Sequence, residues 1–319
     1  MAPIKLIIDT DPGVDDSMAI LSAFNSPEVE VIGLTSLYGN VPTAMATRNA
    51  LRLVHIAGRN DVPVIEGAHT SIRGIAKERI ADFVHGSDGF GNTNQPPLNG
   101  NLSPAQGSAA EFIVKVANTY RGEVTVLALA SLTNVALALQ LDPDLPNKLA
   151  KIVVLGGAFH TSGNVNPAAE ANIYGDPDAA NVVFSRVPNC WLLGLDVTHS
   201  CLLKATSIAS INGKGKHGTF LHDITQFYLG YHKKMYDMDS VFVHDASALA
   251  AVIKPDLFEW HEGKVLVVAD GPAKGKTILD ECKREWVGVN AWTDLPKMKV
   301  ALEVKSEELV EWVIDRMTR

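Results

Sequence analysis

Four aspartates crowd into one short stretch near the N-terminus, Asp9-Thr10-Asp11-Pro12-Gly13-Val14-Asp15-Asp16. The apolar run at 4–8 before it predicts a buried strand, and the apolar spacing after it predicts a helix. No Lys or Arg lies between Lys5 and Arg48 to neutralise these carboxylates locally. Helix capping explains one or two of the aspartates. Three or four carboxylates in one turn repel one another or become protonated unless a cation lies among them.

The ligand types in this stretch favour a hard cation. Carboxylate oxygens are typical ligands of Ca²⁺ and Mg²⁺, and the stretch contains no Cys or His that would favour zinc. We therefore expect a metal site at the strand-to-helix turn in preference to simple capping.

Composition and charge narrow the class of protein. The 319 residues are 46% hydrophobic and 20% charged, which is typical of a globular chain with enough apolar material for a large core. The net charge of −8 and the scattered basic residues argue against a nucleic-acid-binding surface. Three cysteines without metal-ligand spacing indicate reduced thiols. Neither a signal-peptide pattern nor an apolar segment of membrane-spanning length is present, so we expect a cytoplasmic protein without membrane contact.

Apolar runs alternate with helical spacing along most of the chain. Strands are expected at 4–8, 29–37, 62–65, 124–129, 151–155 and 191–195, and helices at 18–23, 43–57, 108–120, 132–141 and 177–185. The alternation predicts an α/β fold, an open, mostly parallel Rossmann-like sheet flanked by helices. The C-terminal part adds helices at 219–236, 246–253 and 307–317 and two strands, at 265–269 and 300–304, expected as antiparallel edge additions. No linker or repeat divides the chain, so one domain spanning 1–319 is expected.

Three segments stand out from this pattern. Residues 67–104 are rich in Gly, Asn, Pro and Ser around His85, and a loop this long is usually functional or a flexible lid. The helix at 219–236 aligns Tyr228, His232 and Tyr236 on one face, which suits either core packing or a pocket wall. The segment 271–277 resembles a phosphate-binding loop but has one residue too few between its glycines, and it predicts a turn between edge strands instead.

Polar residues gather where the predicted strands end. In an open parallel sheet, ligands bind at the carboxyl ends of the strands. These ends carry Asp9 and Asp11, Tyr38-Gly39-Asn40, Leu129-Ala130, Gly156-Gly157 and Asp196. An acidic floor with an amide-rich rim suits a neutral, polyhydroxylated ligand.

The acidic stretch resembles the signature of the nucleoside hydrolases, which cleave nucleosides into base and ribose. The resemblance continues through Gly39-Asn40, His85-Gly86, Leu132-Thr133-Asn134, Gly156-Gly157, Gly163-Asn164, Glu170-Ala171-Asn172, Asp176-Pro177-Asp178-Ala179-Ala180 and His244-Asp245. It covers most of the chain, and the segments 79–86 and 170–173 are most similar to the plant-type uridine/purine ribohydrolases. Ala171 and Ala246 stand where many relatives have phenylalanine and proline, which leaves the base preference open.

The resemblance implies a mechanism and a set of site residues. A Ca²⁺ would be held by Asp11, Asp16, Asp245 and the backbone carbonyl of Leu129 and would lower the pKa of a water. Asp11 would act as general base and His244 as the acid for the leaving base. The substrate-contacting residues implied are Asp15 and Asn40 at the ribose hydroxyls, Asn164, Glu170 and Asn172 at the 5′ side, and His85, Tyr228, His232 and Tyr236 near the base. Uridine, inosine and xanthosine are the expected substrates, and a homo-oligomer is expected, with a dimer favoured over a tetramer.

Two other functions fit part of the pattern. Asp9-x-Asp11 after the first strand resembles the haloacid-dehalogenase-type phosphatases, which use Mg²⁺, although the Asp15-Asp16 pair lacks a counterpart there. A non-catalytic nucleoside-binding protein would keep a similar pocket, but it would need neither Asp11 nor His244.

Overall fold

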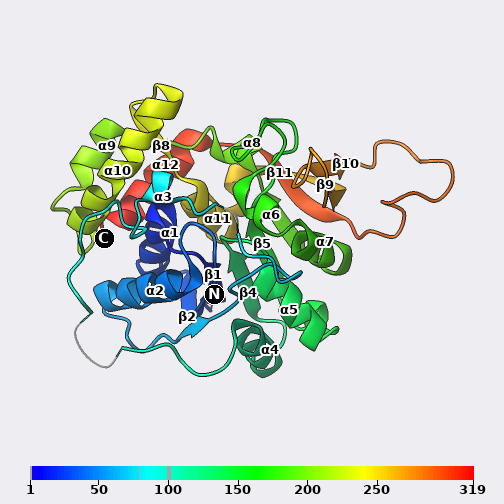
Figure 1. Cartoon of the computed structure of the whole chain (residues 1–319), viewed down its shortest axis with the longest axis horizontal. Helices are drawn as coiled ribbons and strands as arrows, with labels where there is room; N and C mark the ends of the chain where they lie inside the picture. Colours follow the sequence, from blue (N-terminus) through cyan, green and yellow to red (C-terminus); the bar gives the residue numbers. More distant parts are fainter. Residues whose placement is uncertain (1, 78, 99–101) are drawn as a thin grey trace.

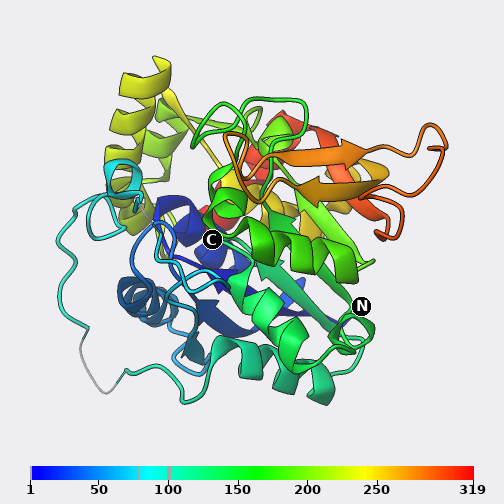
Figure 2. The same cartoon turned by 45° about the vertical axis from the view of Figure 1, so that its right-hand side comes forward.

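The computed structural model of the chain describes residues 2–77, 79–98 and 102–319. Its centre is a nine-stranded sheet with the strand order β10-β9-β11-β6-β5-β4-β1-β2-β3 (Figures 1 and 2). The part β3-β2-β1-β4-β5-β6 has the strand order of the Rossmann fold and is parallel throughout, as predicted. The strands of this sheet are β1 (Ile4–Thr10), β2 (Val29–Ser36), β3 (Val64–Glu66), β4 (Val124–Ala128), β5 (Lys151–Leu155), β6 (Cys190–Leu193), β9 (Phe258–Val267), β10 (Thr277–Asp280) and β11 (Met298–Val304).

Helices cover both faces of this sheet, and a small antiparallel pair of strands, β7 (Leu202–Lys204) and β8 (Ser240–Phe242), lies outside it. The α-helices are α1 (Val14–Phe24), α2 (Thr43–Ala57), α3 (Asp82–His85), α4 (Ala109–Thr119), α5 (Thr133–Leu141), α6 (Ala171–Gly175), α7 (Pro177–Arg186), α8 (Leu195–Thr198), α9 (Ala205–Ile211), α10 (Gly218–Tyr236), α11 (His244–Ile253) and α12 (Ser306–Met317). Two short 3₁₀ turns complete the described elements, Leu145–Asn147 and Pro255–Leu257.

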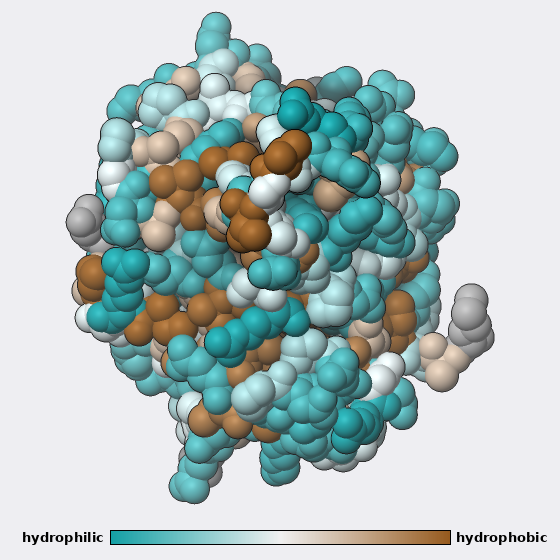
Figure 3. Space-filling model, turned by 90° about the vertical axis from the view of Figure 1, so that its right-hand side faces the viewer, coloured by the Kyte–Doolittle hydropathy of each residue, from teal (hydrophilic) through white to brown (hydrophobic). Residues whose placement is uncertain are grey.

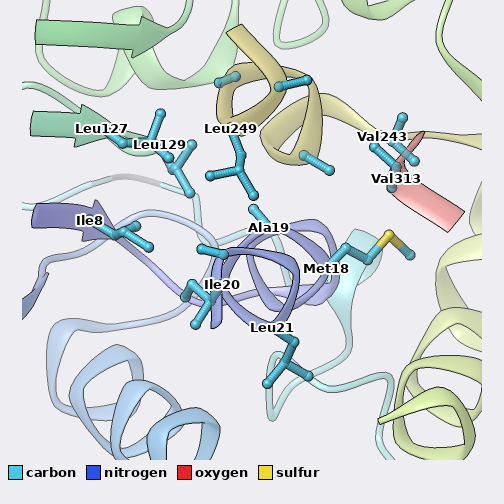
Figure 4. Packing of buried hydrophobic residues seen from close by; sticks show 14 of the residues in the cluster. Ile8, Met18, Ala19, Ile20, Leu21, Leu127, Leu129, Val243, Leu249 and Val313 are labelled. Atoms are coloured by element: carbon cyan, nitrogen blue, oxygen red, sulfur yellow. The ribbon is translucent and has the colours of Figure 1, made fainter. Parts of the chain in front are cut away.

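Strand β1 lies in the middle of the core and is covered on both faces. Because side chains alternate along a strand, Leu6 and Ile8 enter one hydrophobic cluster and Ile7 enters the other. The first cluster includes residues of α1, α2, α10, α11 and α12, and Figure 4 shows Ala19 of α1 and Leu249 of α11 pointing toward each other. The second cluster includes residues of α4, α5 and α7. Burial on both sides explains the nearly continuous apolar run at 4–8.

The chain changes direction across the sheet at β1. Strand β1 pairs in parallel with β2 on one side and with β4 on the other, so Ile8 lies opposite both Leu34 and Leu127. The chain after β1 therefore first forms the side of the sheet that contains β2 and β3. Strand β4 then begins the side that contains β5 and β6. In such folds the crevice at this switch point is the usual ligand site. Asp11 and Leu129 follow the two strands that border it.

The C-terminal strands differ in part from the prediction. Strand β11 pairs antiparallel with β9, as expected, but it pairs parallel with β6, so the prediction of a purely antiparallel addition was wrong. The sequence did not show this pairing because β6 lies about a hundred residues before β11. The first half of β9 was missed as well, because its polar residues, including Glu259 and Glu262, hide a strand that begins at Phe258. The segment 271–277 does form the turn between β9 and β10, ending in the first residue of β10. Among the described residues, no helix is both long and apolar enough to cross a membrane.

The close contact between β2 and α4 predicts a stability effect. A Cβ atom at Gly33 would lie 2.4 Å from Cζ of Phe112, so a side chain there forces the ring or the helix to move. We expect Gly33→Ala to lower the free energy of unfolding by about 1–3 kcal/mol, measured by chemical denaturation. Gly230→Ala is the matched control, because nothing lies within 4 Å of its added Cβ in α10, and it should be neutral or stabilising. Equal effects of the two changes would contradict this packing.

Candidate active site

The predicted site residues meet around one cavity of about 990 Å³ at the carboxyl ends of the central strands. All but two of them line it, namely Asp15, Asn40, His85, Leu129, Asn164, Glu170, Asn172, Tyr228, His232, Tyr236, His244 and Asp245. The two others, Asp11 and Asp16, are buried and accept hydrogen bonds from Asn40, which lines the cavity. The sheet therefore assembles the residues that the sequence motifs singled out, although they lie between positions 11 and 245.

Three carboxylates form a group that fits a metal ion. Asp15, Asp16 and Asp245 are buried, and each offers one oxygen within 4.8 Å of the others. Burial, followed by repulsion from the neighbouring Asp16, raises the pKa of Asp15 to about 8. Burial also raises the pKa of Asp245, with added repulsion from Asp15 and Asp16. Oδ1 of Asp15 is buried without a hydrogen-bond partner among the described residues, so the group lacks a positive charge that a divalent cation would supply.

Asp11 lies beside this group and has its own partners. Its Oδ2 accepts a hydrogen bond of 2.6 Å from the backbone N–H of Asn40, and its Oδ1 accepts a longer one of 3.4 Å from Nδ2 of the same residue. A Cβ atom at Gly39 would lie 1.6 Å from Oδ2 of Asp11, so only glycine allows this approach. Burial raises the pKa of Asp11, and repulsion from Asp16 raises it further.

Capping and cation binding are not alternatives at this turn. Oδ2 of Asp16 accepts hydrogen bonds from the backbone N–H of Gly13 at 3.0 Å and from Nδ2 of Asn40 at 2.9 Å, and Oδ1 accepts one from the hydroxyl of Thr10. Asp16 therefore caps α1 and belongs to the carboxylate group as well. The carbonyl of Leu129, which the resemblance implied as a metal ligand, accepts a hydrogen bond of 2.7 Å from Nδ2 of Asn172.

Asp9 has a structural position. Its Oδ1 accepts hydrogen bonds from the hydroxyl of Thr35 at 2.6 Å and from Nδ2 of Asn134 at 2.8 Å, so it ties β1 to β2 and α5. The residue is fully buried, and burial raises its pKa to about 7. A phosphatase nucleophile would have to line the cavity, and Asp9 is not among the lining residues. Asp196 is structural too, because it accepts hydrogen bonds from the backbone N–H groups of Phe159 and His160.

Two histidines at the cavity are held in the neutral form. Burial, together with His199 and His232 nearby, lowers the pKa of His244 well below its usual value, and its Nδ1 lies 2.7 Å from the hydroxyl oxygen of Thr198. Burial lowers the pKa of His85 to about 3. The backbone N–H of Val14 donates to Nδ1 of His85 at 3.2 Å, so the hydrogen of this ring is on Nε2.

The aromatic stripe of α10 serves both of the uses that the sequence left open. Tyr228 and His232 are buried, Tyr236 is 40% exposed, and all three line the cavity. The ring of Tyr228 stacks on that of His85, with 5.4 Å between the centroids. His232 has both ring nitrogens engaged, Nδ1 with the carbonyl of Tyr228 at 2.9 Å and Nε2 with the backbone N–H of Phe242 at 3.4 Å. His232 thus offers its ring face to the cavity, and neither nitrogen is left for a ligand.

Comparison with known proteins gives the same assignment as the motifs. The family model for the inosine-uridine preferring nucleoside hydrolases matches residues 6–311. The chain belongs to this family. A probable uridine nucleosidase 2 of Arabidopsis thaliana is 46% identical over 314 residues, covering 98% of this chain and 97% of the relative. Uridine nucleosidase 1 of the same plant is 47% identical, covering 97% and 91%. The solved structure of a plant nucleoside hydrolase has a TM-score of 0.96 at 43% identity and covers 99% of both chains.

Further residues of this nucleoside hydrolase shape the part of the cavity that is predicted to take the 5′ side of the ribose. Glu170 caps α6 and accepts hydrogen bonds from the backbone N–H groups of Asn172 at 2.8 Å, and of Gly157 and Ile173 at 3.1 Å. Oδ1 of Asn164 accepts one from the backbone N–H of Ala171 at 2.9 Å. These side chains therefore fix the loop around them, and substrate contacts remain a prediction for them.

Sequence reasoning missed several residues of the cavity wall. Those with the strongest chemistry are Lys77, Arg79, Phe83, Tyr231 and Lys274. Lys77 is half-buried, and its positive charge lowers the pKa of Asp11 and of Glu170. A lone lysine in a polar segment carries no sequence signal, because most such lysines are solvated. The predicted lid at 67–104 includes residues 78 and 99–101, which lie outside the described residues, and its closure stays a prediction.

The buried carboxylates of this nucleoside hydrolase predict a metal-linked change in stability. Without metal, Asp245 must either stay ionised beside two other carboxylates or take up a proton on folding, and Asp245→Asn removes this cost, so the unfolding midpoint in chelator should rise by at least about 2 °C. The wild type should gain stability on addition of Ca²⁺, by about 2.7 kcal/mol at a hundred times the dissociation constant, and the variant should lose this gain. Thermal scans with and without metal measure both effects. Asp256→Asn, at an exposed position, is the control and should change neither. A midpoint that falls in chelator, or an unchanged response to Ca²⁺, would contradict the cluster as a metal site.

Proposed function

We propose that this nucleoside hydrolase cleaves the N-glycosidic bond of ribonucleosides to base and ribose, with uridine as a substrate and inosine and xanthosine as further candidates. The observation that carries the proposal is the buried group of Asp15, Asp16 and Asp245 beside a cavity with an aromatic wall. The names of the Arabidopsis relatives favour uridine. We further propose that the whole chain, 1–319, acts as one domain, because the site takes residues from most of its length.

Calcium is the metal that we propose. The carboxylates and the free carbonyl lone pair of Leu129 are hard oxygen donors, and about six to eight such donors are typical of Ca²⁺. Asp11, Asp16, Asp245 and the carbonyl of Leu129 would hold it, with Asp15 close by. When bound, the ion supplies positive charge that lets the carboxylates ionise and makes an attacking water more acidic.

Asp11 is the proposed general base for the attacking water. Burial and the neighbouring carboxylates raise the pKa of Asp11. Once ionised, its carboxylate is therefore a stronger base toward the proton of the attacking water. Asp15 and Asn40, which both line the cavity, would hold the ribose hydroxyls. The same carboxylates stabilise the positive charge that develops on the sugar as the bond to the base breaks.

The departing base needs hydrogen-bond donors. His244 and His85 line the cavity, and burial favours the neutral form of both rings, so each would act as a hydrogen-bond partner and not as a permanent cation. His244 remains the proposed acid, with the hydroxyl of Thr198 fixing its ring. Lys77 would add positive charge near Asp11, Glu170 and His85, and we propose that it positions the substrate.

Release of ribose tests the proposal directly. Wild-type protein should release reducing sugar from uridine, and this activity should fall to background after a strong chelator and return with Ca²⁺. Asp11→Asn should lose at least about 100-fold in kcat, because a general base contributes about 10²–10⁴-fold. Asp256→Asn should retain full activity. Hydrolysis of an aryl phosphate without ribose release would support the phosphatase instead. Tight binding of uridine without turnover by the Ca²⁺-loaded protein would support a binding protein.

The role of Lys77 predicts a separate kinetic signature. Lys77→Met removes the charge but keeps much of the length, and we expect kcat/KM for uridine to fall about 10- to 100-fold. Most of the loss should appear as a higher KM, because a positioning charge contacts substrate before and during the reaction. Lys77→Arg should keep most of the affinity. The exposed Lys254→Met is the control. If Lys77→Met turned over uridine normally, or if Lys77→Arg were equally impaired, the charge of Lys77 would have no such role.

A further inference from the structure

Two lysines at the amino ends of neighbouring strands share one indole ring. Lys151 begins β5, and Trp191 and Lys299 are the second residues of β6 and β11. In the sheet, Lys299 lies opposite Trp191 on one side. On the other side Trp191 lies opposite Val153, two residues after Lys151, so the side chains of the two lysines and the indole stand on one face. The ammonium groups of Lys151 and Lys299 lie 3.9 Å and 4.6 Å from the ring centroid of Trp191.

These two positive charges have no counter-charge close by. Within the described part of the chain, neither ammonium group forms a hydrogen bond or an ion pair. Lys148, three residues before Lys151, by contrast pairs with Asp142 at 2.5 Å. Glu262 of β9 lies opposite Lys299 in the sheet, but it is not within ion-pair distance of that lysine. Burial, followed by repulsion from Lys299, lowers the pKa of Lys151 to about 8.

The indole between the lysines is held in a fixed orientation. Its N–H donates a hydrogen bond of 3.1 Å to Oδ1 of Asn189, and Nδ2 of Asn189 donates to the backbone carbonyl of Ala150. Attraction to the face of the ring restrains an ammonium group placed over it. The two lysine ends are therefore positioned before any ligand arrives, which lowers the entropy that a ligand must overcome to bind them.

A cavity of about 310 Å³ adjoins this ring, a volume at the lower end of the range for small-molecule sites. It takes apolar surface from Pro188, Trp191 and Met298, and its charged lining residues are Lys297, Lys299 and Glu262. Two positive charges and one negative charge thus line the cavity, and Lys151 adds a third positive charge at the shared ring. Figure 3 faces the side of the molecule that carries β9 and β10 and shows hydrophobic residues among the hydrophilic surface.

This cavity is separate from the catalytic one. Strands β5 and β6 are parallel, and they end in Leu155 and Leu193, which line the catalytic cavity. Lys151 and Trp191 lie at the start of the same two strands, so their cluster is at the opposite edge of the sheet. A ligand there would leave the substrate pocket free.

We propose that the cavity beside Trp191 binds a phosphate group, carried by inorganic phosphate or by a small phosphate ester, between the ammonium groups of Lys151 and Lys299. A phosphate dianion accepts hydrogen bonds from both lysines and neutralises both charges, whereas a single carboxylate neutralises only one. The apolar surface of Pro188 and Met298 would contact the organic part of an ester. The proposal is independent of the nucleoside substrate.

Selective acetylation of lysines tests the site on the wild-type protein. Acetic anhydride reacts only with an unprotonated amine, and mass spectrometry of the peptides reports each lysine separately. Saturating inorganic phosphate should slow the modification of Lys151 by at least about fivefold relative to sodium chloride of equal ionic strength. The bound anion raises the pKa of Lys151, and one pKa unit changes the unprotonated fraction about tenfold. The exposed Lys254 is the internal control and should react equally in both salts.

Calorimetric titration of variants tests the residues and identifies the ligand. The probes are inorganic phosphate and phenylphosphonate, a stable mimic of an aryl phosphate ester. Lys299→Met should raise the dissociation constant of the tighter probe at least about 10-fold, because it removes a charged donor, and Lys254→Met should leave it unchanged. Glu262→Gln should lower it by about twofold or more, since the change removes the carboxylate from the cavity wall.

The two probes separate the two sources of the phosphate group. Tighter binding of phenylphosphonate would identify an ester, and equal or weaker binding would identify the free anion. Thermal scans in chloride check that each variant is folded. Equal modification of Lys151 in phosphate and chloride, or phosphate binding that is unchanged by Lys299→Met, would overturn the proposal. None of these measurements uses a nucleoside, so a failure here is distinct from a failure of the proposed hydrolysis.

Discussion

The repulsion among buried carboxylates is the constraint on which the site depends. Asp11, Asp15, Asp16 and Asp245 interact with one another and are all buried. Two features of the fold reduce the cost. The N-terminal turns of α1 and α11 supply three of these residues, and the partial positive charge at a helix N-terminus favours a carboxylate there. Asn40 also donates hydrogen bonds to both Asp11 and Asp16. Neither feature provides a full positive charge, which is why a divalent cation fits so well.

Burial has opposite effects on the two kinds of titratable group at this site. It raises the pKa of the carboxyl groups and lowers that of the histidines, because in both cases the charged form loses hydration. Without a metal, the site therefore favours protonated carboxyl groups, which are not available as bases, and neutral imidazoles, which are weak acids. A cation among the carboxylates would favour their ionised form and leave the histidines neutral. In the proposed reaction, the chemistry would then rest on ionised carboxylates at the sugar and on hydrogen bonds at the base.

Much of this arrangement could be predicted from the sequence because it depends on local patterns. Alternating apolar runs predicted the parallel core, and the acidic stretch predicted the carboxylate group. Contacts between distant segments carried no such signal. Lys77 and Lys274 reach the cavity through loop paths that no periodicity describes, and the parallel pairing of β11 depends on a neighbour about a hundred residues away. The sequence predicted His232 as a substrate contact. Its ring nitrogens, however, form hydrogen bonds with the backbone of Tyr228 and Phe242, and only the three-dimensional structure shows these contacts.

Strand β10 is tied by hydrogen bonds to the loop that follows β5. Thr277, the first residue of β10, exchanges hydrogen bonds of 2.9 Å with the backbone of Ala158. Nζ of Lys276 donates to the carbonyls of Ala158 and Phe159, and the preceding Gly157 donates its N–H to Glu170 at the cavity. Each of these hydrogen bonds joins a side chain to the backbone, so β10 restrains the loop after β5, and this loop in turn fixes Glu170 at the cavity.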